Sequence, residues 1–257
     1  TELLANPAAS RETLSSFFHP DTEIQSRLSE FSENTLSNFA LPYSIAPNFL
    51  IDGRMYMVPM VIEESSVVAA ASAAARFWAE RGGFHTRIPG TEKSGQFHFL
   101  YRGDHARIDA AKDDIAHWLR QHAHHLEENM KKRGGGIVSI RIVKKPDIAP
   151  DYFQVDAAFE TADAMGANFI NSCLEVFSTA LGEYFESHPG FDVAAYEPLM
   201  AILSNFTPAC VAEAWVECPV DSLGNINGFE AGEFARRFVL ATTIAQKDVY
   251  RAVTHNK

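Results

Sequence analysis

Cysteine is scarce in this sequence, and its scarcity excludes a fold held together by disulfides. The 257 residues contain three cysteines, Cys173, Cys210 and Cys218. An odd number at such wide spacings fits neither a disulfide framework nor the paired spacing of a zinc site. The composition therefore favours a reducing compartment, and we expect a cytoplasmic location.

Basic residues are in the minority as well. Lys and Arg number 22 against 33 Asp and Glu, which gives a formal net charge of -11. A surface that neutralises nucleic-acid phosphates needs clustered Lys and Arg in excess, so we exclude nucleic acid as a partner. Two short basic runs, 131–133 and 144–145, are expected to be solvated ends of elements. The alternative is that one of them meets a phosphate-bearing ligand.

No long hydrophobic run is present. The longest apolar stretch, residues 67–75, is rich in alanine and far shorter than the ~20 residues that cross a bilayer. No signal peptide is visible, so we expect a soluble protein without a membrane partner. With 46% hydrophobic residues the chain can still bury a core, in one large domain or two modest ones.

Histidine, in contrast, is plentiful, with ten residues. His117, His122 and His125 fall within one predicted helix, but their spacing does not build a ligand set with nearby carboxylates. We interpret them as a polar helix face and predict no metal site.

Residues 161–171 form the most informative segment, TADAMGANFIN. Small residues and amides open a helix directly after an alternating, strand-like run. A helix N-terminus offers free N–H groups and the positive end of its dipole to an anion, and Gly166 leaves no bulk to hold a ligand away. The segment predicts a nucleotide seat, although Asp163 could simply cap a packed helix.

The remaining pattern predicts an order of elements. An N-terminal arm of about thirty residues precedes an alanine-rich helix over 63–81, which places Glu63 and Glu64 in its first turn. Beyond Gly90 the periodicity alternates between strand and helix. Strands are expected at 97–102, 137–143, 152–160 and 199–203, and helices at 108–126 and 163–187. This order is that of the split βαβ, ferredoxin-like arrangement. A strand over 210–220 and a helix with loop over 232–257 complete the chain.

Read together, five segments resemble one family. They are LPYSIAPNF at 41–49, PMVIEESSVVAAAS at 59–72, the 161–171 segment, ILSN at 202–205 and YRAVTHNK at 250–257. In this order they are similar to 3-hydroxy-3-methylglutaryl-CoA (HMG-CoA) reductase of the bacterial class II type. The resemblance implies an α+β protein with a mainly helical larger domain, 1–94 and 206–257. A ferredoxin-like (βαββαβ) NAD(P)-binding domain, 95–205, is inserted into it.

The resemblance also assigns roles. Glu64 matches the catalytic acid, and Lys257 matches the lysine whose ammonium stabilises negative charge on the carbonyl oxygen. Arg251 matches the guanidinium that grips the substrate carboxylate, and Ser66 could add a hydroxyl contact. The dinucleotide seat comprises Asp163, Met165, Gly166, Asn168 and Asn205.

Cofactor and partners follow from the same resemblance. A carboxylate at Glu127 would accept from the ribose hydroxyls and repel a 2′-phosphate, which favours NADH over NADPH. The expected reaction converts HMG-CoA to mevalonate and CoA, or the reverse, in a homodimer with active sites at the subunit interface. The aspartate and histidine that complete the family's catalytic set lie beyond THNK, so we expect the natural polypeptide to continue past Lys257. The alternatives are a non-catalytic acyl-CoA or nucleotide-binding module and a ferredoxin-like interaction domain without a ligand.

Overall fold

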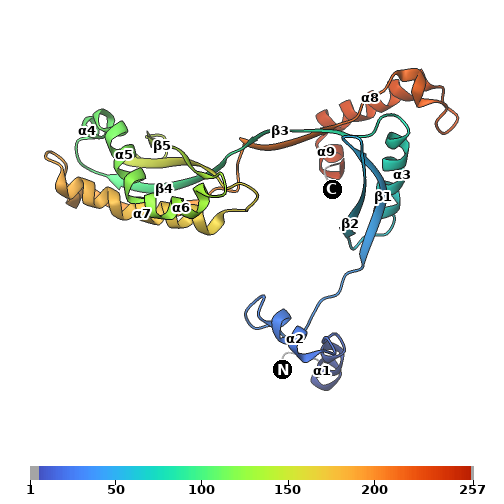
Figure 1. Cartoon of the computed structure of the whole chain (residues 1–257), viewed down its shortest axis with the longest axis horizontal. Helices are drawn as coiled ribbons and strands as arrows, with labels where there is room; N and C mark the ends of the chain where they lie inside the picture. Colours follow the sequence, from blue (N-terminus) through green and yellow to red (C-terminus); the bar gives the residue numbers. More distant parts are fainter. Residues whose placement is uncertain (1–5, 256–257) are drawn as a thin grey trace. The chain divides into compact units, whose positions relative to one another are not determined.

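A computed structural model describes residues 6–255 of the chain (Figure 1). The chain forms two compact units, one of residues 86–213 and one that combines 1–85 with 214–257. The expected insertion boundaries, 95 and 205, both fall inside the first unit. Each unit is therefore described by itself.

The 86–213 unit is built on a four-stranded antiparallel sheet. Its strands are β4 (Lys93–Tyr101), β5 (Gly136–Lys144), β6 (Tyr152–Glu160) and β7 (Tyr196–Leu203), in the order β5-β6-β4-β7. All four strands predicted between 97 and 203 are confirmed, and β6 has the predicted bounds. In β4 and β6 side chains alternate between the two faces, so Phe97, Phe99, Phe153 and Phe159 share the face that is fully buried.

Helices α5 (Lys112–His122) and α7 (Ala167–Ser187) pack on that face and on each other (Figure 1). Helix α7 turns Leu174, Phe177 and Leu181 toward the sheet, where they are fully buried. Gly95 of β4 allows this close approach, because a Cβ there would meet the side chains of Ile170 and Leu174. The contact of Ile170 and Leu174 with Gly95 thus positions the first turns of α7 against the sheet.

The prediction of a single helix over 108–126 is wrong in its continuity. The structure has three shorter helices instead, α4 (His105–Ala110), α5 and α6 (His124–Lys131). Ala111 leaves the helical region at φ -103 and ψ 7, and Asp104 caps α4 through the N–H of Ala106 at 3.0 Å. The hydrophobic spacing runs on across both breaks, which is why the sequence reads as one helix.

Strands β3 (His85–Thr91) and β8 (Cys210–Trp215) pair in a two-stranded sheet. They carry the chain into and out of the 86–213 unit. The strand predicted at 210–220 is therefore shorter than expected, since Pro219 and a 3₁₀ turn, η2 (Val220–Leu223), follow it.

The other unit contains a β-hairpin that the sequence reading missed. Strand β1 (Tyr43–Ile51) pairs with β2 (Arg54–Val61) across a two-residue turn at Asp52 and Gly53. Both turn residues have positive φ, 47° and 78°, as a tight hairpin turn of this kind requires. Helix α3 (Val67–Ala79) contacts β1.

Helix α3 begins later than predicted. Ser66 occupies the N-cap position in a left-handed conformation (φ 73°), so Glu63 and Glu64 precede the helix and do not form its first turn. The remaining helices are α1 (Pro7–Ser15) and α2 (Thr22–Ser29) in the arm, then α8 (Ala231–Lys247) and α9 (Val249–His255), with a 3₁₀ turn η1 (Val193–Ala195) in the first unit. Over residues 6–255, no helix has the length and hydrophobicity needed to cross a bilayer.

Candidate functional site

The loop that joins β6 to α7 carries the predicted nucleotide seat. It runs over residues 161–166, and Gly166 takes the N-cap position of α7 with φ 80°. No side chain at this N-cap bonds to the first turn of the helix. The amides of the first turn thus form an end with positive electrostatic potential, which is the property that suits a phosphate.

Gly166 is required here for two reasons. A left-handed φ favours glycine, and a Cβ on Gly166 would overlap the side chain of Thr161. Thr161 itself is fully buried, and its hydroxyl donates to the carbonyl oxygen of Ala164 at 2.7 Å. The loop is therefore wound tightly around one threonine.

Residues outside the loop hold it from both sides. Lys93 of β4 donates from Nζ to Thr161 Oγ1 and, at 2.7 Å, to the carbonyl oxygen of Ala164. Glu160 accepts from the N–H of Ala162 at 2.8 Å and from the hydroxyl of Thr91. The hydrogen bond from Thr91 lowers the pKa of Glu160, and the loop amides add to that shift. None of these flanking residues was among the candidates drawn from the sequence.

The exposed side of the loop presents the polar candidates. Asp163 has 93% of its side chain exposed and lies 3.6 Å from the guanidinium of Arg133. Met165 is 78% exposed.

Asn168 opens onto a hollow between α6 and α7. The hollow has a volume of about 300 Å³ and is lined by Leu126, Asn129, Met130, Arg133, Asn168, Phe169 and Ser172. Its apolar floor and basic rim place an apolar surface next to a guanidinium. That combination suits a ligand with a flat ring and an anionic group.

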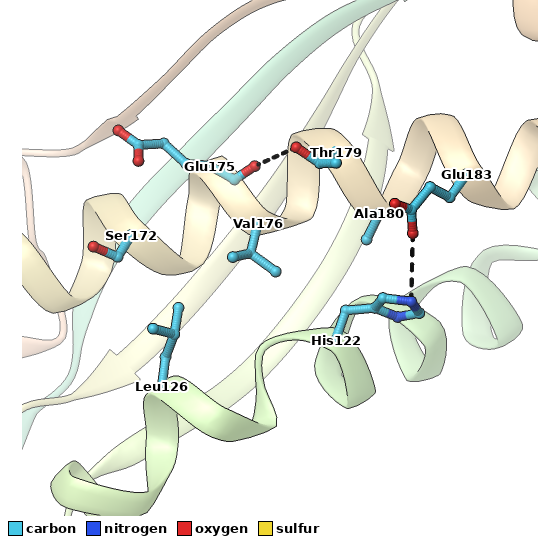
Figure 2. A pocket seen from close by; sticks show the side chains of 8 residues that line it. All are labelled: His122, Leu126, Ser172, Glu175, Val176, Thr179, Ala180 and Glu183. Atoms are coloured by element: carbon cyan, nitrogen blue, oxygen red, sulfur yellow. Dashed lines mark hydrogen bonds and ion pairs between the residues drawn. The ribbon is translucent and has the colours of Figure 1, made fainter.

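A second hollow, of about 420 Å³, adjoins it along α7 and shares Leu126 and Ser172 (Figure 2). In Figure 2, His122 faces Glu183 across it, with Nε2 at 3.6 Å from the carboxylate. The other ring nitrogen of His122 lies 2.8 Å from the carbonyl oxygen of Trp118. Among residues 6–255 no cluster of three His, Cys, Asp or Glu side chains could hold a metal ion.

Glu127 is placed differently from the ribose-binding carboxylate that we expected. Its side chain is 1% exposed, and its oxygens accept from the N–H of Ile137 and from Lys131 Nζ, both at 2.7 Å. The carboxylate thus bonds α6 to the start of β5. In this conformation it offers no free face to a pair of ribose hydroxyls.

Asn205 lies just beyond β7 and is exposed. The end of this strand is held to α7, because Asn171 Oδ1 accepts from the N–H of Leu203 at 2.9 Å. Asn205 and the 161–168 candidates therefore all belong to the 86–213 unit. The loop over 161–166 leads into α7, and the end of β7 is hydrogen-bonded to α7.

The substrate-binding and catalytic candidates belong to the other unit. Glu64 and Ser66 are exposed in the segment that leads into α3. Arg251 is exposed on α9, whose first turn is capped by Asp248 through the N–H groups of Tyr250 and Arg251. Lys257 lies outside the described residues.

Known proteins resemble this chain along its length. The family model of hydroxymethylglutaryl-coenzyme A reductase matches residues 1–257. The 3-hydroxy-3-methylglutaryl-coenzyme A reductase of Archaeoglobus fulgidus is 34% identical over 229 residues, and the probable reductase of Borreliella burgdorferi is 31% identical. Each alignment covers 88% of this chain and 48% of the relative, so the chain spans about half the length of these curated relatives.

A solved structure agrees with the sequence relatives. The class II HMG-CoA reductase of Streptococcus pneumoniae, bound to NADPH in open conformations, superposes with a TM-score of 0.73 at 31% identity. The match covers 98% of this chain and 68% of that one. The chain belongs to the 3-hydroxy-3-methylglutaryl-CoA reductase family.

Proposed function

We propose that the full-length protein is an NAD(P)-dependent reductase that converts HMG-CoA to mevalonate and CoA, or runs the reverse oxidation. One observation carries the proposal. The 161–168 motif is held as an open helix N-terminus in a chain that the reductase family model matches from residue 1 to 257.

The 86–213 unit is the dinucleotide-binding domain in this proposal. Its strand order β5-β6-β4-β7, with helices packed on one face, supports a ferredoxin-like arrangement. The glycine at 166 lets the loop close over the Thr161 side chain, which would overlap a Cβ there, and the loop then presents the first amides of α7 to a pyrophosphate. Asp163, Met165, Asn168 and Asn205 would hold the remainder of the dinucleotide. The NADPH bound to the Streptococcus pneumoniae enzyme supports a nicotinamide dinucleotide for this chain as well.

The preference for NADH over NADPH rested on Glu127, and the burial of that carboxylate removes its support. Arg133, which lines the hollow next to Asn168 and lies 3.6 Å from Asp163, carries a positive charge that would attract a 2′-phosphate bound in this hollow. We therefore keep the dinucleotide in the proposal and leave the choice of NADH or NADPH to the measurement described below.

The chain's own residues would act on the substrate. Two molecules of the reduced dinucleotide, bound in turn, would each supply one of the two hydrides that reduce the thioester to an alcohol and release CoA. Glu64 would donate a proton to the oxygen that gains negative charge, and Lys257 would stabilise that charge electrostatically. Arg251 would bind the distal carboxylate of HMG-CoA in a bidentate manner, with Ser66 as a second donor. The proposal includes a cytoplasmic homodimer whose active sites lie at the subunit interface.

The test uses the full-length gene product. With HMG-CoA present, oxidation of NADH or NADPH is followed by the loss of absorbance of the reduced nicotinamide, and mevalonate is identified by mass spectrometry. Calorimetric titration with NADH, NADPH and CoA separates binding from turnover. Binding without turnover would favour the non-catalytic module, and absence of both would refute the proposal.

A further inference from the structure

Lys93 lies outside every motif of the family resemblance, yet it touches the predicted dinucleotide seat. It is the first residue of β4 and is half-buried. Its ammonium donates to Thr161 Oγ1 and to the carbonyl oxygen of Ala164, two atoms on the loop that leads into α7. A lysine that donates two hydrogen bonds to one loop constrains that loop, because the start of the loop and a residue within it are tied to the same ammonium.

The loop needs such a constraint because its backbone is strained. Ala162, which carries a Cβ, has φ 51°. The left-handed region is unfavourable for an alanine, so the loop would relax if nothing held it. The partners that oppose relaxation are side chains from outside the loop, namely Lys93 on one side and Glu160 with Thr91 on the other.

Thr161 transmits the constraint to the helix N-terminus. Its hydroxyl accepts from Lys93 and donates to Ala164, while its methyl group occupies the space beneath Gly166. A shift of Thr161 would therefore move Gly166 and the amides that follow it. The charge of Lys93 also adds positive potential near an end of α7 that is already positive.

We propose that Lys93 is a positioning residue for dinucleotide binding. It holds residues 161–166 in the shape that presents the first amides of α7 before the dinucleotide arrives. The inference rests on the proposed function, since it names a further residue of that same seat. It predicts that Lys93 affects the affinity for the dinucleotide and leaves the affinity for HMG-CoA unchanged.

The experiment compares three variants of the full-length protein. Lys93→Met keeps the length of the side chain and removes the charge and the donors. Thr161→Val keeps the methyl contact with Gly166 and removes the hydroxyl through which Lys93 acts. Lys112→Met removes a lysine of the same domain that lies outside both basic runs and pairs with Asp109, and it serves as the control. The readouts are the Kd for NADH and NADPH by calorimetry, the KM for HMG-CoA, and the melting temperature.

We expect Lys93→Met and Thr161→Val to raise the Kd for the dinucleotide by about tenfold or more, the worth of one hydrogen bond to a charged group. The KM for HMG-CoA should stay within about twofold of the native value, and Lys112→Met should resemble the native protein. If Lys93→Met does not fold, Thr161→Val supplies the same test.

Two results would overturn the inference while leaving the proposed function intact. One is native dinucleotide affinity in both Lys93→Met and Thr161→Val. The other is a parallel loss of melting temperature and of affinity for both substrates, which would assign Lys93 to the fold alone. If the native protein itself binds neither NADH nor NADPH, the proposed function fails and the inference fails with it.

Discussion

Glu127 and Ile137 are joined by a hydrogen bond of 2.7 Å, from the backbone N–H of Ile137 to the buried carboxylate of Glu127. The bond connects the last helix before the glycine-rich turn at 134–136 to the first residues of β5. The Glu127 carboxylate, which the sequence assigns to the cofactor ribose, thus holds two elements of the fold together in this structure. This relationship leads to the first prediction.

Glu127→Ala should destabilise the protein without changing its choice of dinucleotide. Removal of the carboxylate leaves the N–H of Ile137 buried without its partner, which costs about 1–3 kcal/mol of unfolding free energy. Glu128→Ala, one residue along on the exposed side of α6, is the matched control and should have little effect. Denaturant unfolding measures the stability, and kcat/KM with NADH and with NADPH measures the preference.

The opposite outcome for Glu127 is equally clear. Unchanged stability together with a shift of the preference toward NADPH would restore the carboxylate to the ribose and contradict the structural role.

Gly166→Ala should abolish dinucleotide binding. The substitution places a methyl group against Thr161 and adds the cost of a left-handed conformation, about 1 kcal/mol or more. Gly134→Ala is a matched control, because Gly134 has a similar φ of 85° but open space where an added Cβ would lie. Both variants carry the backbone penalty, and Gly166→Ala alone carries the clash. Calorimetric titration with the dinucleotide should therefore separate them, and equal loss of binding in both would show that the clash is irrelevant.

Cys173 should resist alkylation in the folded protein. It is fully buried on α7, and burial raises the pKa of its thiol to about 12, with the nearby Glu127 carboxylate adding to the effect. The reactive thiolate is therefore absent near neutral pH, whereas Cys210 is exposed. Iodoacetamide followed by peptide mass spectrometry should label Cys210 in the native state and Cys173 only after unfolding.

The raised pKa of Cys173 also sets the sign of a pH effect. Its contribution to stability is fully present below the ordinary thiol pKa of ~8.5 and is lost as the pH rises through the folded value of about 12. Because a serine hydroxyl does not titrate in this range, the unfolding free energy of Cys173→Ser should fall less at alkaline pH than that of the native protein. Rapid labelling of Cys173 in the native state would contradict the burial on which both expectations rest.

The strands of the 86–213 unit could be predicted because each follows a local rule. Residues 152–160 alternate in a strand buried on one face, and 137–143 alternate after a glycine break. The breaks between helices at Ala111 and Ala123 could not be predicted in this way, because alanine is a good helix former. We attribute the breaks to the packing of these helices against α7 and the sheet. The hairpin at Asp52 and Gly53 did have a signal, because an Asp-Gly pair between strand-forming segments is typical of a tight hairpin turn.

The candidate site divides in the same way. The 161–168 segment could be proposed as a nucleotide seat because glycine and small residues at a helix start have a direct physical meaning, and the structure does start α7 there. Lys93 and Glu160 could not, because their roles depend on the register that sets Lys93 opposite Phe159 in the sheet. The burial of Glu127 could not be predicted for a related reason, since the sequence gives the position of a side chain on a helix but not the partners that bury it.

Ser66 provides the last prediction. It stands at the N-cap of α3 with φ 73°, yet its side chain makes no capping hydrogen bond. Serine in a left-handed conformation costs about 1 kcal/mol relative to glycine, and here the hydroxyl returns none of it to the helix. A contact with the substrate carboxylate would explain why a serine occupies the position.

Ser66→Gly should therefore keep or raise the melting temperature while raising the KM for HMG-CoA about tenfold, the worth of one hydrogen bond to a charged group. Ser65→Gly, at the exposed position immediately before it, is the control and should leave the KM unchanged. The KM for the dinucleotide should not move in either variant, because this segment belongs to the other unit. A native KM for HMG-CoA in Ser66→Gly would remove Ser66 from the substrate site and leave its backbone geometry as the feature that starts α3.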